Sequence, residues 1–222
     1  MLIEGYEVDL YDQSTGLAKK FLIAGNGGLN LTHSEDLNRF SQRYTHNEEF
    51  FSELLNEFSP ADLRAFCEEL GVETFVGTSG RVFPKNLKAA EILLKWTKSL
   101  KEHPRFNLHL KHSLIAMSKD KELTFIMPDG EVKIKAKIVI MATGGASWSK
   151  TGSDGKWKNI TDKLQIDSNE FKPMNCGFET KWTEHLVSKL DRAPVKNIGL
   201  SIGSYSCLLY TSDAADDSLR VD

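Results

Sequence analysis

Two glycine clusters in the 222-residue sequence each follow an apolar stretch, and both have the composition of a nucleotide-binding loop. The first contains Gly25, Gly27 and Gly28, followed by Asn30 and Thr32; the second contains Thr143, Gly144 and Gly145, then Gly152, Asp154 and Gly155. Glycine has no Cβ, so the backbone N–H groups of such loops can approach a phosphate or an aromatic ring closely. One cluster alone is equally well explained as a surface turn, but two clusters after two strands favour a nucleotide site.

The strands expected before these clusters would position the site. Residues 6–11 alternate in polarity and predict a short strand ending at Asp12, whose carboxylate could accept both hydroxyls of a ribose. Residues 137–142 are nearly all apolar and predict a strand buried on both faces of an α/β sheet, directly before the second cluster. Parallel strands of this kind bind ligands at their carboxyl ends.

Two further side chains are candidates for contact with a substrate. His33 follows the first cluster and either faces a bound cofactor or is a solvated or capping side chain. Arg81 either binds an anionic group through its planar fork or is an exposed loop arginine. The histidines between His103 and His185 lack the spacing of a metal site, so no metal is expected. No pattern of a nucleophile or an acid–base pair is present, which is typical of an enzyme whose cofactor carries the chemistry.

Composition narrows the class of protein. With 40% hydrophobic and 27% charged residues and a net charge of −3, the chain is expected to be globular and to bind neither nucleic acid nor anionic membrane. No apolar run reaches the roughly 20 residues of a membrane span, and the amino terminus does not resemble a signal peptide. We expect a cytoplasmic protein with a small-molecule substrate. Its three cysteines are too far apart for a redox pair and are expected to be structural thiols.

Local patterns predict a helical subdomain over about residues 34–71. Its helices are expected at 34–44 with Ser34 as the cap, at 47–58, and from Pro60 to Gly71 with Ser59 as the cap. Residues 21–32 are expected to form a loop. Residues 86–102 predict an amphipathic helix. Its expected buried stripe is Leu87, Ala90, Leu93, Leu94 and Leu100.

After Pro104 the polarity pattern changes to a period of two. It predicts a β-meander over about residues 105–135, with turns at 119–121 and at Asp129 and Gly130. A second domain is expected to begin at residue 161, and residues 1–160 to form the nucleotide-binding domain. The predicted class is α/β.

Three segments together resemble one protein family. "KKFLIAGNGGLNLTHSE", "SGRVFPKNLKAAEILL" and "KIVIMATGGASWSKTGSDGKW" occur in the order found in the HI0933-like family of bacterial FAD-dependent oxidoreductases, also labelled the aminoacetone oxidase family. The similarity runs from about residue 2 to residue 203. It implies a Rossmann-like FAD-binding domain with a β-meander crossover and a helical subdomain, interrupted by a second mixed α+β and β-barrel domain that begins over residues 161–206.

The resemblance also implies a role for each candidate residue. Asp12 would bind the adenosine ribose of FAD. The pyrophosphate and flavin would be lined by Lys20, Gly25, Gly27, Gly28, Asn30 and Thr32. The loop that closes over the cofactor would contain Thr143, Gly144, Gly145, Gly152, Asp154 and Gly155. The implied reaction is hydride transfer between NAD(P)H and a small organic substrate; the alternatives are a flavin-binding redox protein without turnover and a fragment that does not retain FAD.

Departures from the family at both ends predict a truncated chain. The family begins with a strand, a GxGxxG turn and a helix, which this sequence lacks, and it continues beyond residue 206. The final segment "CLLYTSDAADDSLRVD", residues 207–222, resembles a translated sequencing adapter. We therefore expect these last residues not to be native.

Overall fold

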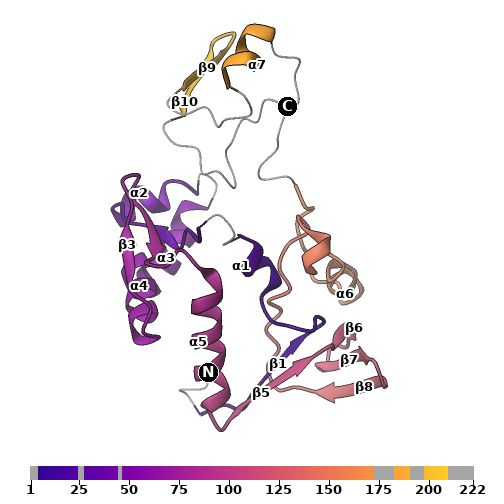
Figure 1. Ribbon diagram of the computed structural model, residues 1–222. Helices are drawn as coiled ribbons and strands as arrows, with labels where there is room; N and C mark the ends of the chain where they lie inside the picture. The colour runs from indigo at the N-terminus through magenta and orange to yellow at the C-terminus, as the bar shows by residue number, and fades with distance from the viewer. Residues whose placement is uncertain (1–4, 25–27, 45–46, 173–182, 191–197, 210–222) are drawn as a thin grey trace.

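A short parallel sheet carries the amino-terminal strand. The computed structural model describes residues 5–24, 28–44, 47–172, 183–190 and 198–209 (Figure 1). Strand β1 (Val8–Asp12) pairs in parallel with β5 (Phe106–Leu110), which places Asp12 opposite Leu110. Helix α5 (Ala89–Glu102) precedes β5, as a parallel pair requires a crossover connection. The α/β class is confirmed.

The predicted strand at residues 137–142 is wrong. The segment has no regular secondary structure, and Ile138 and Ile140 are 52% and 69% exposed. A strand forms only where a neighbouring edge accepts and donates its backbone hydrogen bonds. In the described part of the chain no strand pairs with this segment. Its apolar composition therefore does not produce burial here.

The predicted helical subdomain is present, beside a small antiparallel sheet. It comprises α2 (Leu37–Ser41), α3 (Glu48–Glu57) and α4 (Pro60–Glu69). The sheet has the order β2 (Thr32–His33), β4 (Arg81–Pro84), β3 (Thr74–Val76). Figure 1 shows this subdomain on one side of α5 and the β-meander on the other.

The helix caps correct one prediction and confirm another. Asp36 caps α2 by accepting from the Asn38 N–H, so Ser34 is not the cap. Ser34 directly follows β2, and its N–H and Oγ both donate to the Gly80 carbonyl, at 2.8 and 3.0 Å. Ser59 caps α4 as predicted, in a reciprocal capping box with Asp62.

The loop predicted over residues 21–32 is wrong in its first part. Helix α1 (Lys19–Ala24) occupies it. Ala18 adopts a φ of +54° ahead of this helix, and its carbonyl accepts from the Leu22 N–H. No glycine or proline interrupts the sequence until Gly25, so a short helix is compatible with the local propensities.

The main core joins α4, α5 and the segment before β2. Its buried members are Leu29, Cys67, Val72, Ala89 and Ile92, packed against Phe21, Leu31 and Leu70. The predicted buried stripe is half-buried at Leu93 and Leu100 but wrong at its other three positions. Leu94 is 72% exposed and Leu87 and Ala90 are also exposed, whereas Ala89 and Ile92 are buried. Apolar residues cover more of the α5 surface than the core can contact. The position of the core therefore decides which of these residues are buried.

The β-meander is shorter than predicted. Its strands are β6 (Ser113–Met117), β7 (Glu122–Met127) and β8 (Gly130–Lys135), in that order. Strand β5, expected as its first member, belongs to the parallel sheet. An aromatic stack joins the two sheets, because Tyr11 lies 4.4 Å from both His109 and Phe125, measured between ring centroids.

The rest of the described chain forms short helices, followed by an antiparallel hairpin. It contains the single turn η1 (Ser149–Thr151), α6 (Lys158–Lys163), α7 (Glu184–Leu190) and the hairpin of β9 (Ile198–Ile202) and β10 (Tyr205–Leu209). The expected non-native segment begins inside β10, and residues 210–222 lie outside the described residues. Within the described ranges, none of the helices has the length and apolar character needed to cross a bilayer.

Candidate functional site

The carboxyl end of β1 meets the second glycine cluster. Gln13 follows β1 and donates through Nε2 to the carbonyl of Gly152, at 3.1 Å. Lys20 on α1 donates through Nζ to Ser147 Oγ, at 2.9 Å. The structure thus brings together three of the predicted site elements, although more than a hundred residues separate the loop from the other two.

Asp12 is fixed at this junction by its own backbone. Its Oδ1 accepts from the Ser14 N–H at 2.7 Å, and its carbonyl accepts from the His112 N–H at 3.0 Å. The side chain is half-buried. A carboxylate that accepts from the residue two positions on is held in an Asx turn, so its direction is set before any ligand binds.

Hydrogen bonds within the chain shape the loop of the second cluster. Trp148 and Ser153 exchange two backbone hydrogen bonds of 3.2 Å, and Trp157 Nε1 donates to the Gly144 carbonyl at 2.8 Å. Asp154 accepts from the Lys156 N–H and lies 2.9 Å from its Nζ. These hydrogen bonds lower the pKa of Asp154, so its charge persists to a more acidic pH than that of an unperturbed aspartate.

The fold explains three of the loop's glycines. Gly144, Gly152 and Gly155 have φ values of +72°, +91° and +70°. A Cβ on Gly152 would lie 2.9 Å from Gln13 Nε2, and one on Gly155 would lie 2.8 Å from Ala146 Cβ and from the Phe171 ring. Gly145 differs, because its φ lies outside the left-handed region and no other atom lies within 4 Å of its Cβ position. Nothing in the described part of the fold requires glycine there.

The described part of the first glycine cluster leads into a different sheet. Gly25 and Gly27 fall outside the described residues; Gly28 has a φ of +114°, and a Cβ there would lie 3.7 Å from Leu87 Cδ2. Thr32 pairs with Val82 in the β2–β4 ladder, two residues after the exposed Asn30. Among the hydrogen bonds of the described residues, none joins Asn30 or Thr32 to the end of β1 or to the second cluster.

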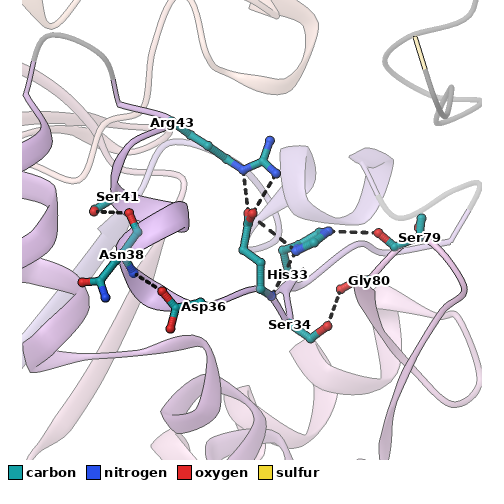
Figure 2. Close-up of polar contacts among 9 residues, drawn as sticks. His33, Ser34, Asp36, Asn38, Ser41, Arg43, Ser79 and Gly80 are labelled. Carbon is teal, nitrogen blue, oxygen red and sulfur yellow. Dashed lines mark hydrogen bonds and ion pairs between the residues drawn. The ribbon is translucent and has the colours of Figure 1, made fainter. Parts of the chain in front are cut away.

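His33 and Arg81 are register partners on β2 and β4. Figure 2 shows the His33 ring between Ser79 and the side chain that Arg43 binds. Its Nδ1 accepts from the Glu35 N–H at 3.1 Å, which assigns the ring proton to Nε2, the donor to the Ser79 carbonyl at 3.0 Å. Both ring nitrogens are therefore used within the fold. Arg81 is half-buried at the start of a strand and is not an exposed loop arginine.

Glu35 connects this histidine to α2. Arg43 donates to both carboxylate oxygens of Glu35, at 2.5 and 2.8 Å, and this pairing lowers the pKa of Glu35. The Glu35 side chain is only 13% exposed. A bidentate pair at a largely covered carboxylate fixes the end of α2 against β2.

Three residues that shape the site were not predicted from the sequence. Gln13 and Ser147 hold the loop against β1 and α1, and Trp157 holds the Gly144 carbonyl within the loop. Only Gln13 had a local signal, since it is a polar residue directly after a predicted strand end. Within the described ranges, no group of three His, Cys, Asp or Glu side chains could hold a metal ion. Cys67 is a buried free thiol, and burial raises its pKa.

Comparison with known proteins identifies the family. The model of the HI0933-like protein Rossmann domain matches residues 2–181. A curated relative, the 3-dehydro-bile acid delta(4,6)-reductase of Clostridium scindens, is 27% identical over 149 residues, which are 67% of this chain and 35% of the relative. The chain thus spans about a third of the length of that relative. Since the family model covers most of the sequence, the chain belongs to the HI0933-like Rossmann-domain family.

Proposed function

We propose that the chain forms part of the FAD site of a flavoprotein oxidoreductase. Membership of the HI0933-like family supports this proposal, and so does the similarity to a reductase. The observation that carries it is Gly145, a glycine of the loop that Gln13 binds at the carboxyl end of β1 and one that the described part of the fold does not require. Its backbone is open to close approach by a planar or phosphorylated ligand.

The surrounding residues have the chemistry that such a cofactor needs. The Asp12 carboxylate, oriented by Ser14, suits the hydroxyls of the adenosine ribose. Lys20 adds a positive charge next to the glycine loop, where a pyrophosphate would need one. Gly25, Gly27, Gly28, Asn30 and Thr32 remain proposals for the pyrophosphate and flavin side.

The role of this chain in catalysis would be to bind and orient. Bound FAD would supply the hydride chemistry. Asp12 and Lys20 would hold the ends of the nucleotide through hydrogen bonds and charge. The loop around Gly145 would cover the cofactor and exclude water from it. In this proposal, NAD(P)H donates the hydride to FAD and a small organic substrate accepts it. His33 and Arg81 are proposed to border the substrate side.

Binding of FAD to the Gly145→Ala variant tests the proposal. The added methyl has no neighbouring atom within 4 Å among the described residues, so we expect folding to be unaffected. The affinity for FAD, measured by quenching of flavin fluorescence, should fall about tenfold or more. The matched control is Gly16→Ala, at a second glycine with open space around its Cβ position and a φ outside the left-handed region. Equal FAD affinity of Gly145→Ala and the wild type, or no FAD binding by the wild-type chain, would contradict the proposal for this chain.

Turnover separates an enzyme from a flavin-binding protein without turnover. Steady oxidation of NADH or NADPH by the FAD-loaded protein in the presence of an acceptor is the expected result. Bound FAD that is never reduced by either nicotinamide would favour the protein without turnover.

A further inference from the structure

Helix α3 has a wider apolar face than the fold covers. Phe51 and Leu55 are half-buried, and Phe51 stacks on Tyr44 with ring centroids 3.8 Å apart. A second set of apolar residues, four apart in the sequence, is more exposed, although the Phe50 ring meets Phe51 edge-on with ring centroids 5.4 Å apart. Its members Phe50, Leu54 and Phe58 are 56%, 48% and 54% exposed. Residues four apart lie on one side of a helix, so Phe50 and Leu54 form an apolar stripe, and Phe58, the extended C-cap residue of α3, follows directly after the helix.

An acidic row runs parallel to this stripe. Glu49, Glu53 and Glu57 each directly precede one of the three exposed apolar residues. The sequence has no lysine or arginine between Arg43 and Arg64, and among the described residues no ion pair joins these glutamates to a cation. Like charges four residues apart destabilise an isolated helix. Local helix stability therefore does not explain the row.

From this pairing of rows we infer that the outer face of α3 docks a basic amphipathic helix of a partner protein. The outer face is defined as Phe50, Leu54, Phe58, Glu49, Glu53 and Glu57. A complementary helix would bring apolar side chains four residues apart onto the stripe, each next to a lysine or arginine for the acidic row.

Charge decides among the classes of ligand. Three uncompensated carboxylates repel nucleic acid and anionic lipid, so neither fits this face. An uncharged apolar partner would leave the carboxylates beside a newly buried surface without partners, which is unfavourable. A basic partner neutralises them, and rim charges of this kind also steer association. The inference does not depend on FAD, because the outer face shares no residue with the nucleotide site.

A synthetic helical peptide is the probe for this docking. It carries leucines four residues apart, each followed by a lysine, and a second peptide has glutamate in place of lysine. Titration of the labelled peptides into the full chain, followed by fluorescence anisotropy, is expected to show binding of the lysine peptide alone. Its affinity should fall with added salt, because the charged rim is solvent-exposed.

Variants of the outer face locate the binding. Phe50→Ser with Leu54→Ser should lower the affinity about tenfold or more, since two exposed anchors are lost. Neutralising Glu49, Glu53 and Glu57 to glutamine should weaken binding and remove most of the salt dependence. The control, Ile126→Ser with Glu131→Gln, changes an exposed apolar residue and its acidic cross-strand partner on β7 and β8. This control should bind like the wild type.

Three results would overturn the inference. The first is equal binding of the lysine and glutamate peptides, which would indicate apolar adhesion only. The second is no binding of either peptide to a chain whose circular dichroism is native. The third is self-association in sedimentation that Phe50→Ser with Leu54→Ser abolishes, because the occupant would then be a second copy of this chain.

Discussion

The substitution Gly155→Ala tests whether the second glycine cluster is shaped by its own packing. Gly155 is buried and has a φ of +70°, and a Cβ there would lie 2.8 Å from both Ala146 Cβ and Phe171 Cε2. Contacts this short force the loop or the Phe171 ring to move. The variant therefore perturbs both the backbone conformation and the packing.

The magnitude follows from these two effects. A non-glycine residue in the left-handed region costs about 1–2 kcal/mol. Overpacking of a buried site by one methyl group costs about 1–3 kcal/mol. Together they predict a loss of about 2–5 kcal/mol in the free energy of unfolding of the segment that contains the loop. This is a large fraction of the roughly 5–15 kcal/mol that stabilises a typical domain.

Urea denaturation and amide hydrogen exchange measure the effect. The free energy of unfolding reports a global change, and exchange of the Ser153 N–H, which donates to the Trp148 carbonyl, reports a change confined to the loop. Gly145→Ala is the matched control in the same loop, since nothing lies within 4 Å of its Cβ position. If the two variants have the same unfolding free energy and the same Ser153 exchange rate, the packing argument is refuted.

Three further perturbations test the core, a charged pair and a turn. Ile92→Ala should lower the free energy of unfolding by about 2–5 kcal/mol, whereas Leu94→Ala on the same helix should change it by less than about 0.5 kcal/mol; chemical denaturation of the two variants distinguishes buried from exposed apolar positions. Hydrogen bonding from Arg43 lowers the pKa of Glu35 from its ordinary value of 4.5, so the stability it contributes is present above pH 4.5 and is lost as the pH falls through the lower folded-state value. Glu35→Gln should therefore flatten the acid side of the stability profile, and an unchanged slope below pH 4.5 would argue against the pairing. Gly80→Ala would place a Cβ 2.6 Å from His33 Cε1, so thermal unfolding should show a loss that His33→Ala partly restores; equal losses in the single and double variants would exclude this contact as the cause.

Local sequence signals predicted the elements that carry their own start and stop residues. Ser59, Pro60 and Gly71 bounded α4 as expected, because a capping box and a left-handed glycine act within one helical turn. The turn at Asp129 and Gly130 and the alternating strands on either side were predicted for the same reason. The family itself was recognised from three short motifs in the right order.

Several features depended on partners far away in the sequence. The polarity pattern of α5 indicated an amphipathic helix, but contact with Cys67 and Val72 decided that Ile92, and not Leu94, is buried. The apolar composition of residues 137–142 indicated a buried strand, yet a strand needs a neighbouring edge, and no described strand provides one.

The candidate site also has features that follow from local sequence and features that depend on distant contacts. The sequence by itself determined the residue types that can hold a nucleotide: an acid at a strand end, a lysine and two glycine clusters. Only the tertiary structure decided which of them meet, because hydrogen bonds from Gln13 and Lys20 to a loop far along the chain are not encoded in local spacing. It also separated the glycines that the loop's own conformation requires from Gly145, since that distinction depends on which atoms surround each Cα.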